Sequence, residues 1–102
     1  MDYRKQQLIE HFITKCSMAI EEATKVAEMN QMLQEQLNKR NVRFYFKKID
    51  GSIRSAYGTL ASSEMPEIKG TGKPLNFDLQ LYYDLEKKSF RSFKKSNLLH
   101  YD

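Results

Sequence analysis

The 102-residue sequence contains one cysteine, two histidines and no tryptophan. The single Cys16 excludes a disulfide within the chain. His11 and His100 lie far from each other and from Cys16, so the spacing typical of metal ligands is missing. With so few candidate nucleophiles and bases, we expect no enzyme activity, no metal and no cofactor.

Long apolar runs are also missing. No window approaches the roughly 18 apolar residues that a membrane-spanning helix requires. The first residues, Met1–Lys5, precede mixed polar sequence and lack the apolar core of a signal peptide. We therefore expect a cytoplasmic protein without a membrane partner.

Glycine and proline are absent from residues 1–41, whereas all four glycines and both prolines follow residue 50. This shift indicates a helix first and strands second. The sequence thus predicts an α+β fold with two parts, an N-terminal helix over 1–41 and a small barrel of four or five antiparallel strands over 42–102.

Apolar residues at helical spacing run through the first part and predict one helix from about Asp2 to Asn38, on the order of 55 Å long. A helix of that length must project, break near residue 30 or pair with another chain. Pairing would make the protein a homo-oligomer. The candidate interaction face consists of Ile9, Phe12, Cys16, Ala23, Val26 and Leu33.

Asn30 interrupts this stripe. A lone asparagine at such a position can fix the register of a parallel coiled coil. Alternatively, Asn30 marks where the stripe leaves the core or where the helix ends.

Alternation predicts the strands. Val42, Phe44 and Phe46 alternate with polar or amphipathic residues, as in a half-buried strand. Asp50-Gly51 is typical of a two-residue hairpin turn and predicts a return strand over 52–60. Alternation over 77–84 predicts a third strand, and shorter segments at 89–93 and 97–101 predict two more.

The stretch 61–76 lacks periodicity and contains four turn-forming residues, which favours a long loop. Its Lys-Gly-Thr-Gly-Lys segment departs from the phosphate-loop pattern. A flexible loop and a backbone cradle for an anion remain the two interpretations of Lys69, Gly70, Gly72 and Lys73.

The excess positive charge lies in the second part. Residues 1–41 contain six basic and six acidic residues, whereas residues 42–102 contain 11 and 7, which gives the whole net charge of +4. Basic residues among aromatic ones suit single-stranded nucleic acid or another anionic ligand. The candidates are Arg91, Arg54, Lys48, Lys47, Arg43, Lys94, Tyr82 and Phe93.

A plainer interpretation is a solvated sheet face whose lysines protect strand edges from aggregation. Arg91 carries the same ambiguity, because its guanidinium can clamp a phosphate or carboxylate, or it can pair with Asp84 or Asp78 of the neighbouring strand.

Several short motifs occur in a recognisable order: the hairpin 47–54, the strand end 56–60, the loop 69–73, Tyr-Tyr-Asp-Leu-Glu at 82–86, Phe-Arg-Ser-Phe at 90–93 and Asn97-Leu98. Over about 60 residues this order resembles the WYL-like family of small Sm/SH3-type β-barrel proteins of bacteria, phages and mobile elements. The resemblance implies a barrel fold and a ligand-sensing or nucleic-acid-binding role. Arg91-Ser92-Phe93 matches the Arg-x-Phe element of the related WYL domains.

Where those domains carry Trp-Tyr-Leu, this chain reads Asp78-Leu79-Gln80, so that part of their ligand site does not carry over. Two hypotheses follow. The first is a regulatory binding module that contacts nucleic acid or an anionic ligand through its basic barrel. The second is an assembly protein, in the manner of a phage factor, that contacts a host protein through its helix.

Overall fold

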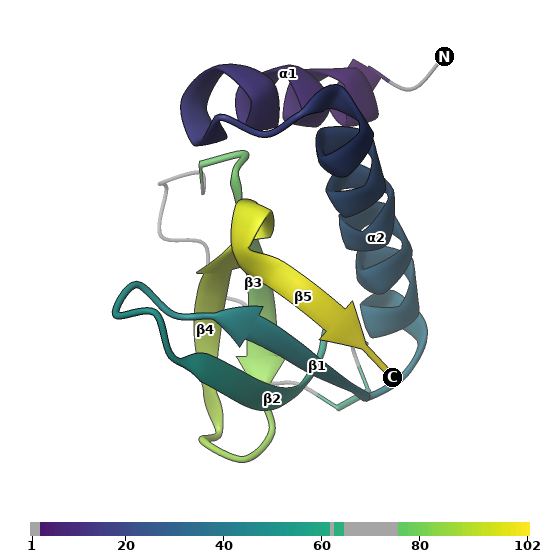
Figure 1. Cartoon of the computed structure of the whole chain (residues 1–102). Helices are drawn as coiled ribbons and strands as arrows, with labels where there is room; N and C mark the ends of the chain where they lie inside the picture. Colours follow the sequence, from purple (N-terminus) through teal and green to yellow (C-terminus); the bar gives the residue numbers. More distant parts are fainter. Residues whose placement is uncertain (1–2, 62, 65–75) are drawn as a thin grey trace.

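The computed structural model describes residues 3–61, 63–64 and 76–102 (Figure 1). Two helices precede five strands, which confirms the predicted α+β class. The elements are α1 (Tyr3–Cys16), α2 (Ile20–Lys39), β1 (Val42–Lys47), β2 (Ile53–Thr59), β3 (Leu79–Asp84), β4 (Ser89–Lys94), the 3-10 turn η1 (Lys95–Asn97) and β5 (Leu98–Tyr101).

The prediction of a single long helix is wrong, and so is a break near residue 30. The chain leaves helical geometry at Ser17, whose φ of 56° lies in the left-handed region that ends helices. The N–H of Met18 donates to Phe12 O at 3.1 Å and closes the last turn of α1. The chain then folds back, and α1 packs across one end of α2 (Figure 1).

Large side chains on α1 pack against small ones on α2. Leu8 and Phe12 are buried against Ala23 and Ala27, and the small alanines let the two helices approach closely. The predicted interaction face is thereby covered by the chain itself. Phe12 and Ala23 belong to this helical cluster, Ile9, Cys16 and Val26 pack against it, and Leu33 lies in the barrel core.

The strands form one antiparallel sheet in the order β4-β3-β2-β1-β5. In β1 the predicted alternation is confirmed, with Val42, Phe44 and Phe46 buried. Leu33 and Leu37 of α2 join the same core, so α2 closes the barrel and the core crosses the predicted boundary at residue 41.

Aromatic rings fill the barrel. Phe44 meets the ring of Tyr82 edge-on at 4.9 Å and that of Phe93 at 5.3 Å, while Phe46 stacks on Phe93 at 5.2 Å. Such pairs add about 0.5–1.5 kcal/mol each beyond the area they bury. Gly58 makes room for them, because a Cβ there would lie 2.6 Å from the Tyr82 ring.

Strand β3 alternates as predicted, but its buried side is the more polar one. Gln80, Tyr82 and Asp84 are buried, whereas Leu79 and Leu81 between them are only half-buried. Gln80 donates to Leu81 O at 2.9 Å. A buried carboxylate at position 84 requires charged partners, which the candidate site supplies.

The β1–β2 hairpin has a longer turn than the predicted two residues. Gly51 N–H donates to Lys48 O and Lys48 N–H donates to Ser52 O, at 3.0 and 2.7 Å. Gly51 has a φ of +90°, which fits a three-residue hairpin loop with a left-handed glycine.

Asn30 lies in the middle of α2 and is buried. Its Nδ2 donates to Val26 O and to Lys95 O of η1, each at 2.8 Å. Asn30 therefore links the helix to the barrel, which is neither of its predicted roles.

Candidate anion-binding site

A pocket of about 710 Å³ opens at one end of the barrel, between the β1–β2 hairpin, β4 and η1; we call it the mouth pocket. Five cations line it, namely Lys47, Lys48, Arg54, Arg91 and Lys94. Its main apolar residues are Phe46, Ile49, Leu79, Tyr82 and Phe93. Cations and apolar side chains thus meet in one concave surface.

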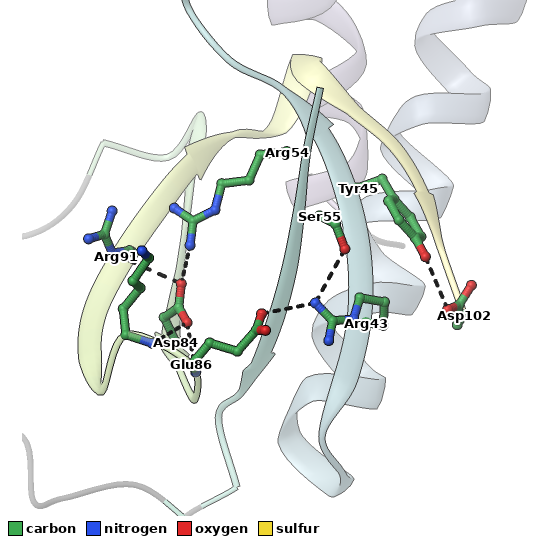
Figure 2. A network of polar contacts seen from close by, with 9 residues as sticks. Arg43, Tyr45, Arg54, Ser55, Asp84, Glu86, Arg91 and Asp102 are labelled. Carbon is green, nitrogen blue, oxygen red and sulfur yellow. Dashed lines mark hydrogen bonds and ion pairs between the residues drawn. The ribbon is translucent and has the colours of Figure 1, made fainter. Parts of the chain in front are cut away.

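The structure brings seven of the eight predicted nucleic-acid or anion-binding residues to this pocket. The exception, Arg43, lies outside its lining on β1. The Arg43 side chain donates to Ser55 Oγ at 3.2 Å and Glu86 Oε1 at 2.9 Å (Figure 2). Its guanidinium also lies 5.0 Å from the Tyr57 ring centroid.

Two predicted site residues are part of the core. Tyr82 is fully buried and Phe93 nearly so, so neither offers a ring face on which a base could stack. They form the floor of the mouth pocket instead. Burial also raises the pKa of the Tyr82 hydroxyl, and no residue in the described ranges forms a hydrogen bond with that hydroxyl.

A fully buried carboxylate, that of Asp84 at the end of β3, holds one side of the pocket together (Figure 2). Its Oδ1 accepts the backbone N–H groups of Glu86 and Lys87 at 3.0 and 2.9 Å, and so fixes the β3–β4 turn. Its Oδ2 accepts a hydrogen bond from Arg54 Nη2. The fold can bury the charge of the Asp84 carboxylate because the carboxylate is paired with an arginine and accepts hydrogen bonds on both oxygens.

The two arginines beside Asp84 differ in how tightly they are held. The Arg54 side chain is 21% exposed and is hydrogen-bonded to the carboxylate, whereas Arg91 is 44% exposed and its Nε lies 4.0 Å from the same oxygen. That separation is too long for a hydrogen bond. Arg54 is therefore the closer partner of Asp84. Arg91 forms a longer ion pair with the same carboxylate, as one of its two predicted roles required, and its side chain remains almost half exposed at the pocket.

Among the described residues that line the pocket, Asp50 is the only acidic one, and its side chain is hydrogen-bonded within its own turn. Asp50 Oδ1 accepts the backbone N–H and the hydroxyl of Ser52 at 2.9 and 2.6 Å. These hydrogen bonds lower the pKa of Asp50 below its usual value. The exposed Lys47, Lys48 and Lys94 lie in the same lining, so cations outnumber this carboxylate at the pocket.

The predicted anion loop, with Lys69, Gly70, Gly72 and Lys73, lies outside the described residues. Within the described ranges, no group of three or more His, Cys, Asp or Glu residues is placed to hold a metal ion. Over the same ranges, no helix combines the length and apolar character needed to cross a membrane.

Sequence reasoning missed Asp84 as the centre of the site, as well as the pocket residues Phe46, Ile49 and Leu79. A signal for Asp84 existed. An aspartate directly before a polar turn commonly accepts backbone N–H groups two or three residues further along.

The curled antiparallel sheet, closed by a helix, forms a small β-barrel with a basic mouth and an aromatic floor. Residues 30–99 match the WYL_2 family model, which is described as an Sm-like SH3 β-barrel fold. The chain belongs to that family, in agreement with the resemblance of its motifs. Neither the curated proteins nor the solved structures provide a significant match.

Proposed function

We propose that this protein is a non-catalytic binding module that takes single-stranded nucleic acid at the mouth pocket. The observation that carries the proposal is the ring of five cations around an apolar floor. Cations at such a site neutralise backbone phosphates and release counterions, which supplies most of the affinity for nucleic acid.

Arg91 is the principal phosphate contact in this proposal. Because Arg54 already neutralises Asp84, the exposed guanidinium of Arg91 keeps donors for a phosphate oxygen. Lys48 and Lys94 are exposed in the same lining and add charge without fixed geometry.

The base of the bound nucleotide meets aliphatic rather than aromatic surface. Ile49 at the hairpin tip is 93% exposed, and Leu79 is half-buried beside the floor. Cations at the rim and an aliphatic wall form no hydrogen bonds that distinguish one base edge from another. We therefore expect binding with little sequence preference and strong salt dependence.

The test is fluorescence anisotropy with a labelled, mixed-sequence 12-nucleotide single strand at 50 and 200 mM NaCl. Arg91→Ala should weaken binding about tenfold at the lower salt and reduce the slope of log affinity against log salt by about 0.7, the value for one lost phosphate contact. Lys15→Ala removes the same charge from an exposed position on α1 and should change affinity less than twofold.

Equal effects of the two substitutions would show attraction by net charge alone, without a site. Affinity that is independent of salt would also contradict the proposal. Circular dichroism of each variant confirms that it is folded before the comparison is made.

The second hypothesis, contact with a host protein or a second copy through the helix, has less support. The six residues of that face pack within the chain. Association through the same face would require α1 to separate from α2.

A further inference from the structure

A second hollow lies between the two helices and the barrel, away from the mouth pocket. It has a volume of about 890 Å³, within the range of small-molecule sites. The N-terminal half of α1 forms one wall, the C-terminal half of α2 a second, and the residues around β3 and η1 a third. We call it the helix–barrel cleft.

Half of the residues that line this cleft carry a side-chain amide. Four of them follow one another on α2 at helical spacing, namely Asn30, Gln31, Gln34 and Asn38. A side-chain amide carries a donor and an acceptor in one plane and can bind the edge of a planar heterocycle, as when asparagine or glutamine binds adenine. At Asn30 the acceptor is the group left for such a ligand, because Nδ2 donates to two backbone carbonyls.

Asn30 is the fixed member of the group. Its Nδ2 is engaged by two backbone carbonyls, which determines its orientation, and the residue is 3% exposed. Its Oδ1 is buried and accepts no hydrogen bond from the described part of the chain. A ligand donor that enters past the exposed Gln34 would satisfy this acceptor.

Two further residues supply an anion contact and a ring. Lys95 is half-buried, and burial lowers the pKa of its ammonium group despite the nearby Asp78 carboxylate. Phe77 is 53% exposed, and the ring of His11 meets it edge-on at 5.0 Å. Phe77 therefore presents a supported ring to the cleft.

We propose that the helix–barrel cleft binds a nucleoside monophosphate whose base carries an exocyclic amino group. The amino group donates to Asn30 Oδ1, the ring lies against Phe77, and the phosphate pairs with Lys95. The α1 residues of the cleft precede the family match at residue 30, whereas Asn30, Phe77 and Lys95 lie within it. The cleft proposal depends on neither the mouth pocket nor the nucleic-acid proposal.

The test is isothermal titration calorimetry of the full chain with adenosine 5′-monophosphate. Inosine 5′-monophosphate, in which a carbonyl replaces the amino group, should bind at least fivefold more weakly. Adenosine should also bind more weakly, because it lacks the phosphate. If inosine 5′-monophosphate binds equally well, or if adenosine 5′-monophosphate does not bind at millimolar concentration, the proposal is overturned.

Two substitutions locate the site. Lys95→Gln should weaken adenosine 5′-monophosphate at least fivefold and leave adenosine unchanged, whereas Gln6→Ala, an exposed position on α1 outside the lining, should change neither. Arg91→Ala should leave this binding intact. If Arg91→Ala abolishes it and Lys95→Gln does not, the nucleotide occupies the mouth pocket and the cleft proposal fails, while the proposed function stands.

Discussion

The mouth pocket and the helix–barrel cleft are lined by different kinds of side chain. In the mouth pocket, five cations and the Asp50 carboxylate, which is hydrogen-bonded within its own turn, lie around an aromatic floor. In the cleft, half of the lining residues carry a side-chain amide. Charge attracts at a distance and discriminates little, while amides act only at contact and require matched geometry. One small chain therefore presents two surfaces that differ in range and in selectivity.

The largest effect is expected when the mouth pocket loses the carboxylate that pairs with its arginines. Asp84→Ala should lower the free energy of unfolding by about 3–5 kcal/mol, because Arg54 loses its buried partner and the β3–β4 turn loses the acceptor of two N–H groups. Urea denaturation followed by circular dichroism measures the loss. Glu86→Ala, which removes an exposed partner of Arg43, should cost less than about 1 kcal/mol. Equal losses would show that Asp84 is not the centre of the site.

Salt should separate the two pockets. With about three phosphate contacts at the mouth, affinity for the oligonucleotide should fall roughly 10- to 20-fold between 50 and 200 mM NaCl. Affinity for adenosine 5′-monophosphate at the cleft should fall less than about threefold, since one ion pair contributes there. Titrations of both ligands at both salt concentrations make the comparison. Parallel salt dependence would mean that both ligands share one site.

A smaller effect on stability is expected at Asn30, which lines the cleft and links α2 to η1. Asn30→Ala removes the donor to Lys95 O and should destabilise the protein by about 1–2 kcal/mol. Asn38→Ala, on an exposed part of the same helix, should stay within about 0.5 kcal/mol of the original protein. Thermal or urea unfolding gives both values. No difference between the variants would contradict the linking role of Asn30.

The smallest effect is expected at the hydroxyl of Tyr82, in the floor of the mouth pocket. Tyr82→Phe removes a buried hydroxyl that lacks a partner in the described structure and should raise stability by about 0.5–1 kcal/mol. Burial raises the pKa of Tyr82 above its ordinary value of 10.0, so stability should fall as the pH rises from about 10 through the folded-state pKa. The variant should lose less stability over that range. Urea unfolding at pH 8 and at pH 10.5 tests both points, and a net loss at pH 8 would show that the hydroxyl is satisfied.

Much of the barrel was predictable because its strands obey simple rules. In β1, one apolar side faces the core and one polar side faces solvent, so alternation identified the buried residues. Strand β3 shows where that rule fails. Its buried side carries Gln80 and Asp84, whose partners lie elsewhere in the sequence, and no local pattern shows that a carboxylate will meet Arg54.

The helical part was harder to predict. The apolar spacing continues through Ser17 without a glycine or proline, so nothing in the periodicity marks the break. The useful signal was in side-chain size, because large Leu8 and Phe12 on one segment complement small Ala23 and Ala27 on the next. Size complementarity indicates two packed helices, whereas periodicity alone indicates a helix.

The candidate site was predicted as a set of residues but not as a geometry. The clustering of basic residues in the hairpins and beside Arg91 identified most of the mouth pocket. Tyr82 and Phe93 were predicted as site residues, but both are buried, since aromatic residues on a small barrel are needed first for its core. Which rings remain for a ligand depends on how the strands close, and composition does not determine this.

The place of α2 in the barrel core determines where the chain can be shortened. Leu33 and Leu37 fill the core beside the strands, so a fragment that begins at residue 42 would expose that side of the core to water. The family match begins at residue 30, inside α2, and therefore includes both leucines. Helix α1 contacts mainly α2, so a fragment that begins at residue 30 keeps both leucines without the rest of the helical part.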